Sequence, residues 1–175
     1  MSTLVIYESM WGNTREVAQA VADGLGDDVA AVEVNDAPGG VPADVDLLVV
    51  GGPTHAFSMS RASTRRDAED KGAAVGHAAR GIREWLDGLP ASDHVAVATF
   101  DTRVGSVRHL PGSAAKAAAK QVRRHHVGHL VSTESFYVAD MAGPLLDGEL
   151  DRAHAWGRSL DAQRRQHPPL TDRHE

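Results

Sequence analysis

The stretch that decides the fold is residues 4–14, which read LVIYESMWGNT. Its first four residues are apolar, as expected of a strand that is covered on both faces in a parallel sheet. Its end leads directly into a helical pattern over 13–25, with apolar Val17, Val21 and Leu25 at four-residue spacing. The stretch therefore predicts a strand, a tight turn and a helix in direct succession.

The turn between them carries groups that suit an anion. The first N–H groups of a helix have no partners inside the helix, and the helix dipole favours negative charge near them. Ser9, Asn13 and Thr14 add side-chain donors, and Gly12 lets the backbone approach a ligand closely. Asn13 followed by Glu16 also resembles a capping box, so the turn alone favours helix capping and anion binding equally.

The same two patterns alternate along the rest of the chain. Strands are predicted at 47–50 and 95–100, with a weaker one at 29–34 and a last one over 130–138. Helices are predicted at 78–89, 113–124 and 150–164. This alternation predicts an α/β three-layer sandwich, in which helices cover both faces of a five-stranded parallel sheet. We expect one domain over 1–165 and a flexible tail over 166–175.

Composition narrows the classes of function. The 175 residues suit one domain, and the absence of cysteine excludes disulfides and thiolate metal sites. A net charge of −6 disfavours nucleic-acid binding, which needs a basic surface. No apolar run is long enough to cross a membrane, and the N-terminus lacks a signal-peptide pattern. We therefore expect a cytoplasmic protein.

Two more loops follow predicted strands. Residues 51–61 read GGPTHAFSMSR and open a long connection to the helix at 78, and residues 100–109 read FDTRVGSVRH. Connections this long inside a domain are usually functional. Because the carboxyl ends of parallel strands meet at one edge, all three loops are expected to form a ligand site there. Trp11, Phe57 and Phe100 lie in or beside the loops and would offer flat surfaces to a planar ring.

These residues resemble the flavodoxin family, over nearly the whole chain. The family's phosphate loop reads Ser/Thr-x-Ser/Thr-Gly-x-Thr, and the chain has SMWGNT at residues 9–14, with Trp11 in place of the middle hydroxyl. The resemblance implies a flavodoxin-like sheet in the order 2-1-3-4-5, for which flavodoxin is itself the standard example. It also implies a flavoprotein that binds flavin mononucleotide (FMN) where the first and third strands part.

The resemblance further implies which residues hold FMN. Residues 9–14 would wrap the phosphate, the second loop would contact the ring and the ribityl chain, and backbone N–H groups near 102–105 would reach the ring's carbonyl edge. The expected cofactor-binding residues are Ser9, Met10, Trp11, Gly12, Asn13, Thr14, Pro53, Thr54, His55, Ala56, Phe57, Phe100, Asp101, Thr102, Arg103 and Gly105. No catalytic residue and no metal ligand is expected.

The chain departs from the usual family pattern at several positions. The third loop has no Tyr, and Arg103 would place a positive charge near the ring, which would raise the flavin's potential. We expect His55 to pack or hydrogen-bond rather than to transfer protons, and Asp101 to cap its loop locally. The histidines at 125, 126 and 129 suit an exposed helix end better than a metal site. Residues 61–71 mix both charges, as in a solvated helix or a lid.

Three functions remain open. The first is an FMN-binding electron-transfer protein that docks transiently with redox partner proteins. The second is an FMN-dependent oxidoreductase that uses NAD(P)H and a quinone-type acceptor, and the third is a flavodoxin-like interaction module that has lost FMN. The chain has no Gly-x-Gly-x-x-Gly fingerprint for a dinucleotide, which favours the electron carrier. Both a monomer and a dimer are compatible with the sequence.

Overall fold

The computed structural model describes residues 2–74 and 78–166. The strands are β1 (Ser2–Tyr7), β2 (Ala31–Glu33), β3 (Val45–His55), β4 (Ser58–Met59), β5 (Ser92–Val104) and β6 (Val127–Val138). The helices are α1 (Asn13–Leu25), α2 (Ala62–Asp70), α3 (Ile82–Asp87), α4 (Ala114–Arg124) and α5 (Glu149–Gln166), with a short 3-10 turn, η1, at Gly105–Val107. The expected tail lies outside the described residues except for Gln166, which ends α5.

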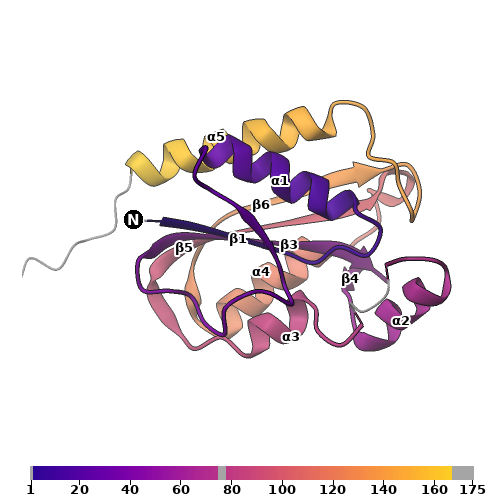
Figure 1. Cartoon of the computed structure of the whole chain (residues 1–175), viewed down its shortest axis with the longest axis horizontal. Coiled ribbons are helices and arrows are strands. Elements are labelled where there is room, and N and C mark those ends of the chain that lie inside the picture. The colour runs from indigo at the N-terminus through magenta and orange to yellow at the C-terminus, as the bar shows by residue number, and fades with distance from the viewer. Residues whose placement is uncertain (1, 75–77, 167–175) are drawn as a thin grey trace, which may run out of the picture.

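Five strands run parallel in the order β2-β1-β3-β5-β6. This is the predicted order 2-1-3-4-5, because β4 is a two-residue strand that pairs antiparallel with the end of β3. Helices α1 and α5 cover one face of the sheet, α3 and α4 cover the other, and α2 stands apart at one end (Figure 1). The predicted three-layer flavodoxin-like fold is confirmed.

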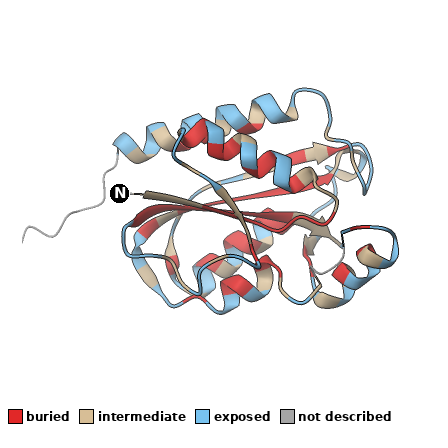
Figure 2. Ribbon diagram, viewed as in Figure 1, coloured by how far each residue is buried: buried red, intermediate tan, exposed pale blue. Residues whose placement is uncertain are grey.

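Alternate residues of the central strands feed two separate cores. Val5 and Val49 pack beneath α1 and α5, whereas Ile6 and Val50 pack toward α3 and α4. All four side chains are fully buried, and Figure 2 shows the central strands as buried along most of their length. Burial on both faces explains why these strands read as continuous apolar runs rather than as alternating ones.

The start of α1 differs from the predicted capping box. Gly12 is the N-cap in the left-handed region, with φ of 94°, and Asn13 is already the first helical residue. The cap is supplied by Ser9, whose Oγ accepts hydrogen bonds from the N–H groups of Gly12 at 3.1 Å and Arg15 at 3.3 Å. The prediction that Asn13 caps the helix is therefore wrong.

Across the part of the chain that the structure describes, no helix combines the length and the apolar character that crossing a bilayer requires.

Candidate functional site

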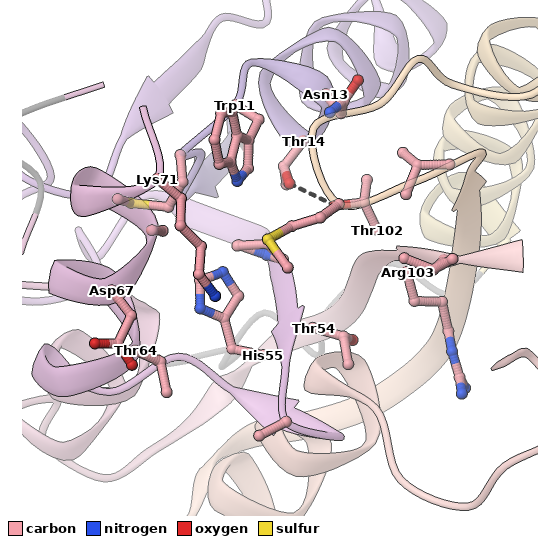
Figure 3. Close-up of a pocket in the computed structure, with 17 residues that line it drawn as sticks. Trp11, Asn13, Thr14, Thr54, His55, Thr64, Asp67, Lys71, Thr102 and Arg103 are labelled. Atoms are coloured by element: carbon pink, nitrogen blue, oxygen red, sulfur yellow. Dashed lines mark hydrogen bonds between the residues drawn. The ribbon is translucent and has the colours of Figure 1, made fainter. Parts of the chain in front are cut away.

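A cleft of about 260 Å³ opens at the carboxyl ends of β1, β3 and β5. Its walls are the loop after β1, the end of β3, helix α2, the end of β5 and the segment that follows β6 (Figure 3). Ten of the expected cofactor-binding residues line it: Met10, Trp11, Asn13, Thr14, Pro53, Thr54, His55, Ala56, Thr102 and Arg103. Two others, Ser9 and Gly12, line an adjoining hollow, to which Met10 and Trp11 also contribute.

The first turn of α1 presents free donors at one end of this cleft. The N–H groups of Asn13 and Thr14 have no hydrogen-bond partner among the described residues. The hydroxyl of Thr14 is engaged, because its Oγ1 lies 2.7 Å from Oγ1 of Thr102 in a buried hydrogen bond. This bond joins α1 to β5, and one of the two hydroxyl protons is left to donate elsewhere.

The hairpin between β3 and β4 holds His55 in the cleft. Its two central residues, Ala56 and Phe57, have positive φ angles of 47° and 64°, which are uncommon for residues other than glycine. Thr54 at the base of the hairpin anchors it. Its Oγ1 donates to Asp101 at 3.2 Å and accepts from the N–H of Ala114 at 2.9 Å. A backbone that is strained yet firmly anchored is a feature of ligand sites.

The surroundings of His55 shift its pKa toward the neutral form. Burial lowers the pKa of its imidazole, and the positive charge of Arg65 lowers it further, against a hydrogen bond to the backbone of Thr64 that raises it. A neutral imidazole with one nitrogen directed at the backbone keeps its other nitrogen for a ligand. The expectation that His55 packs and hydrogen-bonds is compatible with this geometry.

Two of the expected residues lie in the interior instead of at the cleft. Phe100 is 1 % exposed and packs edge-on against Phe136 and Trp156, with centroids 6.2 and 6.0 Å away. Asp101 is fully buried, and its Oδ2 accepts from the N–H of Ala115 at 2.9 Å. Asp101 therefore caps the distant helix α4, not its own loop as predicted.

The two remaining expected residues also lie away from the lining. The side chain of Phe57 is half exposed, and the residue packs against Gly112, where an added Cβ would come within 2.6 Å of its carbonyl oxygen. Gly105 begins the turn η1 and lies against Leu146. Phe57, Phe100, Asp101 and Gly105 are therefore not among the residues that line the cleft, and their contact with a cofactor stays a prediction.

Arg103 lines the cleft, but its guanidinium is turned away from Thr14 and Thr102 (Figure 3). It is 6 % exposed, and its Nη2 donates to the carbonyls of Val107 at 3.0 Å and Leu110 at 3.1 Å. Arg103 therefore holds the loop after β5 in place, which the sequence did not indicate.

Helix α2 forms a wall of the cleft that sequence reasoning missed. It contributes Thr64, Asp67 and Ala68, and Lys71 follows at its end. The segment was predicted as a solvated helix or lid, and the only signal for a site was the length of the connection after β3. Three other lining residues missed in the sequence come from strand ends and the segment after β6, namely Val104, Val138 and Met141.

A buried polar network attaches α2 to the body of the protein. Arg65 is fully buried and donates to Oγ of Ser60 at 2.8 Å and to Glu84 at 3.0 Å. The hydroxyl of Ser60 donates to Glu8 at the end of β1, and Glu8 also accepts from the N–H of Ile82 at 2.9 Å. The network thus joins β1, α2 and α3 beside the cleft.

The carboxyl groups of this network have opposite pKa shifts. Burial raises the pKa of Glu8 and outweighs the hydrogen bonds from Ser60 and Ile82 that lower it. Burial alone would also raise the pKa of Glu84, but hydrogen bonds from Arg65 and Gly81, with the charge of Arg65, lower it overall. The more exposed Glu84 is therefore the carboxylate that pairs with Arg65.

The histidines near the end of α4 lie at the end of the helix, as expected. His125 follows the last residue of α4, and its Nε2 lies 3.1 Å from Asp87. Among residues 2–74 and 78–166, no group of three or more His, Cys, Asp or Glu side chains is arranged to hold a metal ion.

Known proteins share this architecture. Residues 4–65 match a family model described as a flavodoxin domain. A flavodoxin from the domain Archaea has a TM-score of 0.58 at 17 % identity, over 93 % of this chain and 98 % of the other. The oxidised flavodoxin 1 of Bacillus cereus has a TM-score of 0.57 at 18 % identity, over 95 % of this chain and 99 % of the other. No curated protein matches the chain in sequence.

A WrbA-like flavodoxin from Agrobacterium tumefaciens has a TM-score of 0.53 at 20 % identity, over 94 % of this chain and 98 % of the other. At these identities the solved structures establish the fold. A parallel α/β sheet with helices on both faces and a cleft at the carboxyl ends of its strands defines the class of doubly wound α/β proteins. The chain therefore has a flavodoxin-like fold, and its first 65 residues include a match to a flavodoxin domain.

Proposed function

We propose that the protein binds FMN in this cleft and serves as an electron-transfer protein. The observation that carries the proposal is that Asn13 and Thr14, whose N–H groups have no partner among the described residues, line a cleft at the carboxyl ends of β1 and β3. An anion is the ligand that a helix N-terminus favours. When bound, FMN supplies the redox chemistry, and the protein supplies position and electrostatics.

The residues present fit the phosphate end of FMN. Gly12 adopts a left-handed φ that other residues tolerate poorly, and this bend exposes the first N–H groups of α1. Among the described residues, the charged side chains that line the cleft are Lys71, Arg103 and Asp67. The guanidinium of Arg103 is bonded to the loop after β5, so Lys71 is the lining cation that would meet a phosphate monoester.

The ring end would be held by different side chains from those expected. Trp11 and His55 lie on one side of the cleft, and Thr102 and Arg103 lie on the other (Figure 3). Thr54 and Asp101 fix the hairpin that carries His55. These residues would orient the isoalloxazine, whereas Phe100 is buried in the core beneath the cleft.

Reconstitution tests the proposal directly. Purified apoprotein is mixed with FMN, and free flavin is removed by gel filtration. We expect one FMN per chain, with quenched flavin fluorescence and a shifted visible spectrum. Asn13→Pro removes one of the two free N–H groups at a helix position that proline tolerates. It should weaken FMN binding about tenfold. Absence of bound flavin in the wild-type protein would refute the proposal.

A second measurement separates carrier from enzyme. An electron carrier, once reduced, passes electrons to a protein such as cytochrome c but oxidises NAD(P)H slowly by itself. Steady-state oxidation of NAD(P)H with a quinone, saturating in both substrates, would instead identify an FMN-dependent oxidoreductase. If the protein neither binds flavin nor shows activity in either assay, the remaining function is that of an interaction module.

A further inference from the structure

The three tryptophans of the chain differ in whether the indole N–H has a hydrogen-bond acceptor. The indole Nε1 of Trp85 donates to the carbonyl of Pro38 at 2.8 Å, and that of Trp156 donates to Oγ of Ser132 at 3.0 Å. The Nε1 of Trp11 is buried and has no acceptor among the described residues. Buried donors in native proteins nearly always have a partner, so this orphaned group calls for an explanation.

Trp11 lies where a ligand can supply that partner. It lines the cleft at the same end as Asn13 and Thr14, whose N–H groups are also free (Figure 3). Its ring packs against Met10, Ala68 and Ala73, which fix the indole between the loop after β1 and the α2 segment. Three donors without a partner among the described residues therefore belong to residues 11–14, all of which except Gly12 line the cleft.

We propose that the indole N–H of Trp11 donates a hydrogen bond to the phosphate of the bound ligand, so that Trp11 makes the cleft selective for a phosphorylated flavin over riboflavin. The inference rests on the proposed function. An indole is a donor only, so an acceptor is needed to satisfy it, and a phosphate monoester offers three acceptor oxygens. Trp11 thereby supplies a donor at the loop position where the family pattern has a hydroxyl.

Trp11→Phe tests the role, because it removes the N–H and keeps an aromatic ring for the packing with Met10 and Ala68. The dissociation constants of FMN and riboflavin are measured by flavin fluorescence for wild type and variant. We expect FMN to bind about tenfold to a hundredfold more weakly, as for the loss of a hydrogen bond to a charged group. Riboflavin should change less than about twofold. Trp156→Phe, which removes an indole N–H away from the cleft, should leave the ratio of the two constants unchanged.

An equal loss for both flavins, or no loss for either, would overturn the proposal, because Trp11 would then contact the ring or only support the fold. The indole ¹H–¹⁵N NMR signals give a second readout in the unmutated protein. The Trp11 signal should move on addition of FMN and of inorganic phosphate, but much less with riboflavin. The Trp85 and Trp156 signals serve as references.

The two proposals fail in different ways. If neither flavin binds, the proposed FMN function is refuted. The shift of the Trp11 indole signal with inorganic phosphate then tests whether Trp11 binds phosphate, and an unmoved signal refutes that role. If FMN binds and the Trp11 signal responds equally to riboflavin, the FMN function stands and the role of Trp11 is refuted.

Discussion

At the scale of single residues, the site depends on polar groups that burial has made unusual. Glu8 is 1 % exposed, directly before the ligand loop, and shares its carboxylate oxygens between Ser60 and the N–H of Ile82. Burial raises the pKa of this carboxyl, despite the hydrogen bonds and the charge of Arg65 that lower it. Burial therefore favours the protonated form more in the folded state than in the unfolded chain, and this links Glu8 to the pH dependence of stability.

The sign of that linkage gives a prediction. A carboxyl whose pKa is higher when folded stabilises the protein fully below its unfolded pKa, and this contribution is lost as pH rises through the folded pKa. The Gln side chain of Glu8→Gln is neutral at every pH. As pH rises above 4.5, the ordinary pKa of Glu, the wild type should therefore lose unfolding free energy relative to the variant. Urea unfolding at a series of pH values measures the difference, and parallel curves would contradict it.

At the same scale, Gly51 shows how tightly Phe100 is enclosed. A Cβ at position 51 would lie 2.0 Å from the Phe100 ring, which is itself wedged among Phe136 and Trp156. Gly51→Ala should therefore cost about 3 kcal/mol of unfolding free energy, the upper part of the range for overpacking. Gly39→Ala, where nothing lies within 4 Å, is the matched control and should change stability by less than about 0.5 kcal/mol. Similar losses in both variants would show that the Phe100 contact is not the cause.

At the scale of elements, α2 is a wall of the cleft with little buried apolar surface of its own. Its buried residues are Arg65 and Ala68, and its remaining residues are polar or small. The helix is held through Arg65, which donates to Ser60, Glu84 and the carbonyl of Ala78 at 3.0 Å. An element fixed by one buried cation is expected to respond strongly to loss of that charge.

Arg65→Met should therefore loosen α2 while the sheet stays folded. We expect a loss of about 2 kcal/mol or more in global stability, because the buried acceptors lose their donor. Amide hydrogen exchange should accelerate over 60–72, more than in β3 or β5. Arg66→Met, one residue further on and exposed, is the control. If exchange over 60–72 is equally slow in both variants, the network is not what holds α2.

At the scale of the whole molecule, the chain has a net charge of −6, yet the charged residues that line the cleft in the described part of the chain are Lys71, Arg103 and Asp67. This distribution favours an anionic ligand and disfavours the acidic surroundings that a strongly reducing flavin carrier would have. Ligand binding to the folded state alone stabilises it by mass action.

FMN should therefore raise the melting temperature. At a concentration a hundred times its Kd, the gain is about 2.7 kcal/mol, which corresponds to roughly 5–10 °C for a domain of this size. Circular dichroism, which the flavin's fluorescence does not disturb, measures the shift. AMP at the same concentration carries a phosphate without the isoalloxazine and should raise the melting temperature much less. An unchanged melting temperature with FMN would contradict flavin binding to the folded chain.

The sequence by itself determined the order of strands and helices and the edge of the sheet where the loops meet. Apolar periodicity is a local property, so runs such as 47–50 and the helical pattern over 13–25 can be read without knowing their partners. The loops after β1 and β3 were found for the same reason, since each directly follows a recognisable strand. The turn over residues 9–14 was the clearest local signal of a ligand site.

Only the tertiary structure decided which residues of β5 face the cleft. The polar sequence Asp101-Thr102-Arg103 resembled a loop, yet β5 continues to Val104, because Asp101 is satisfied by α4 and Thr102 by Thr14. Those partners are distant in sequence, and no local pattern specifies them. The polar helix α2 was likewise invisible as a cleft wall, because its place depends on the buried contacts of Arg65. Local periodicity fixes elements, whereas pairing of buried polar groups across the chain fixes the site.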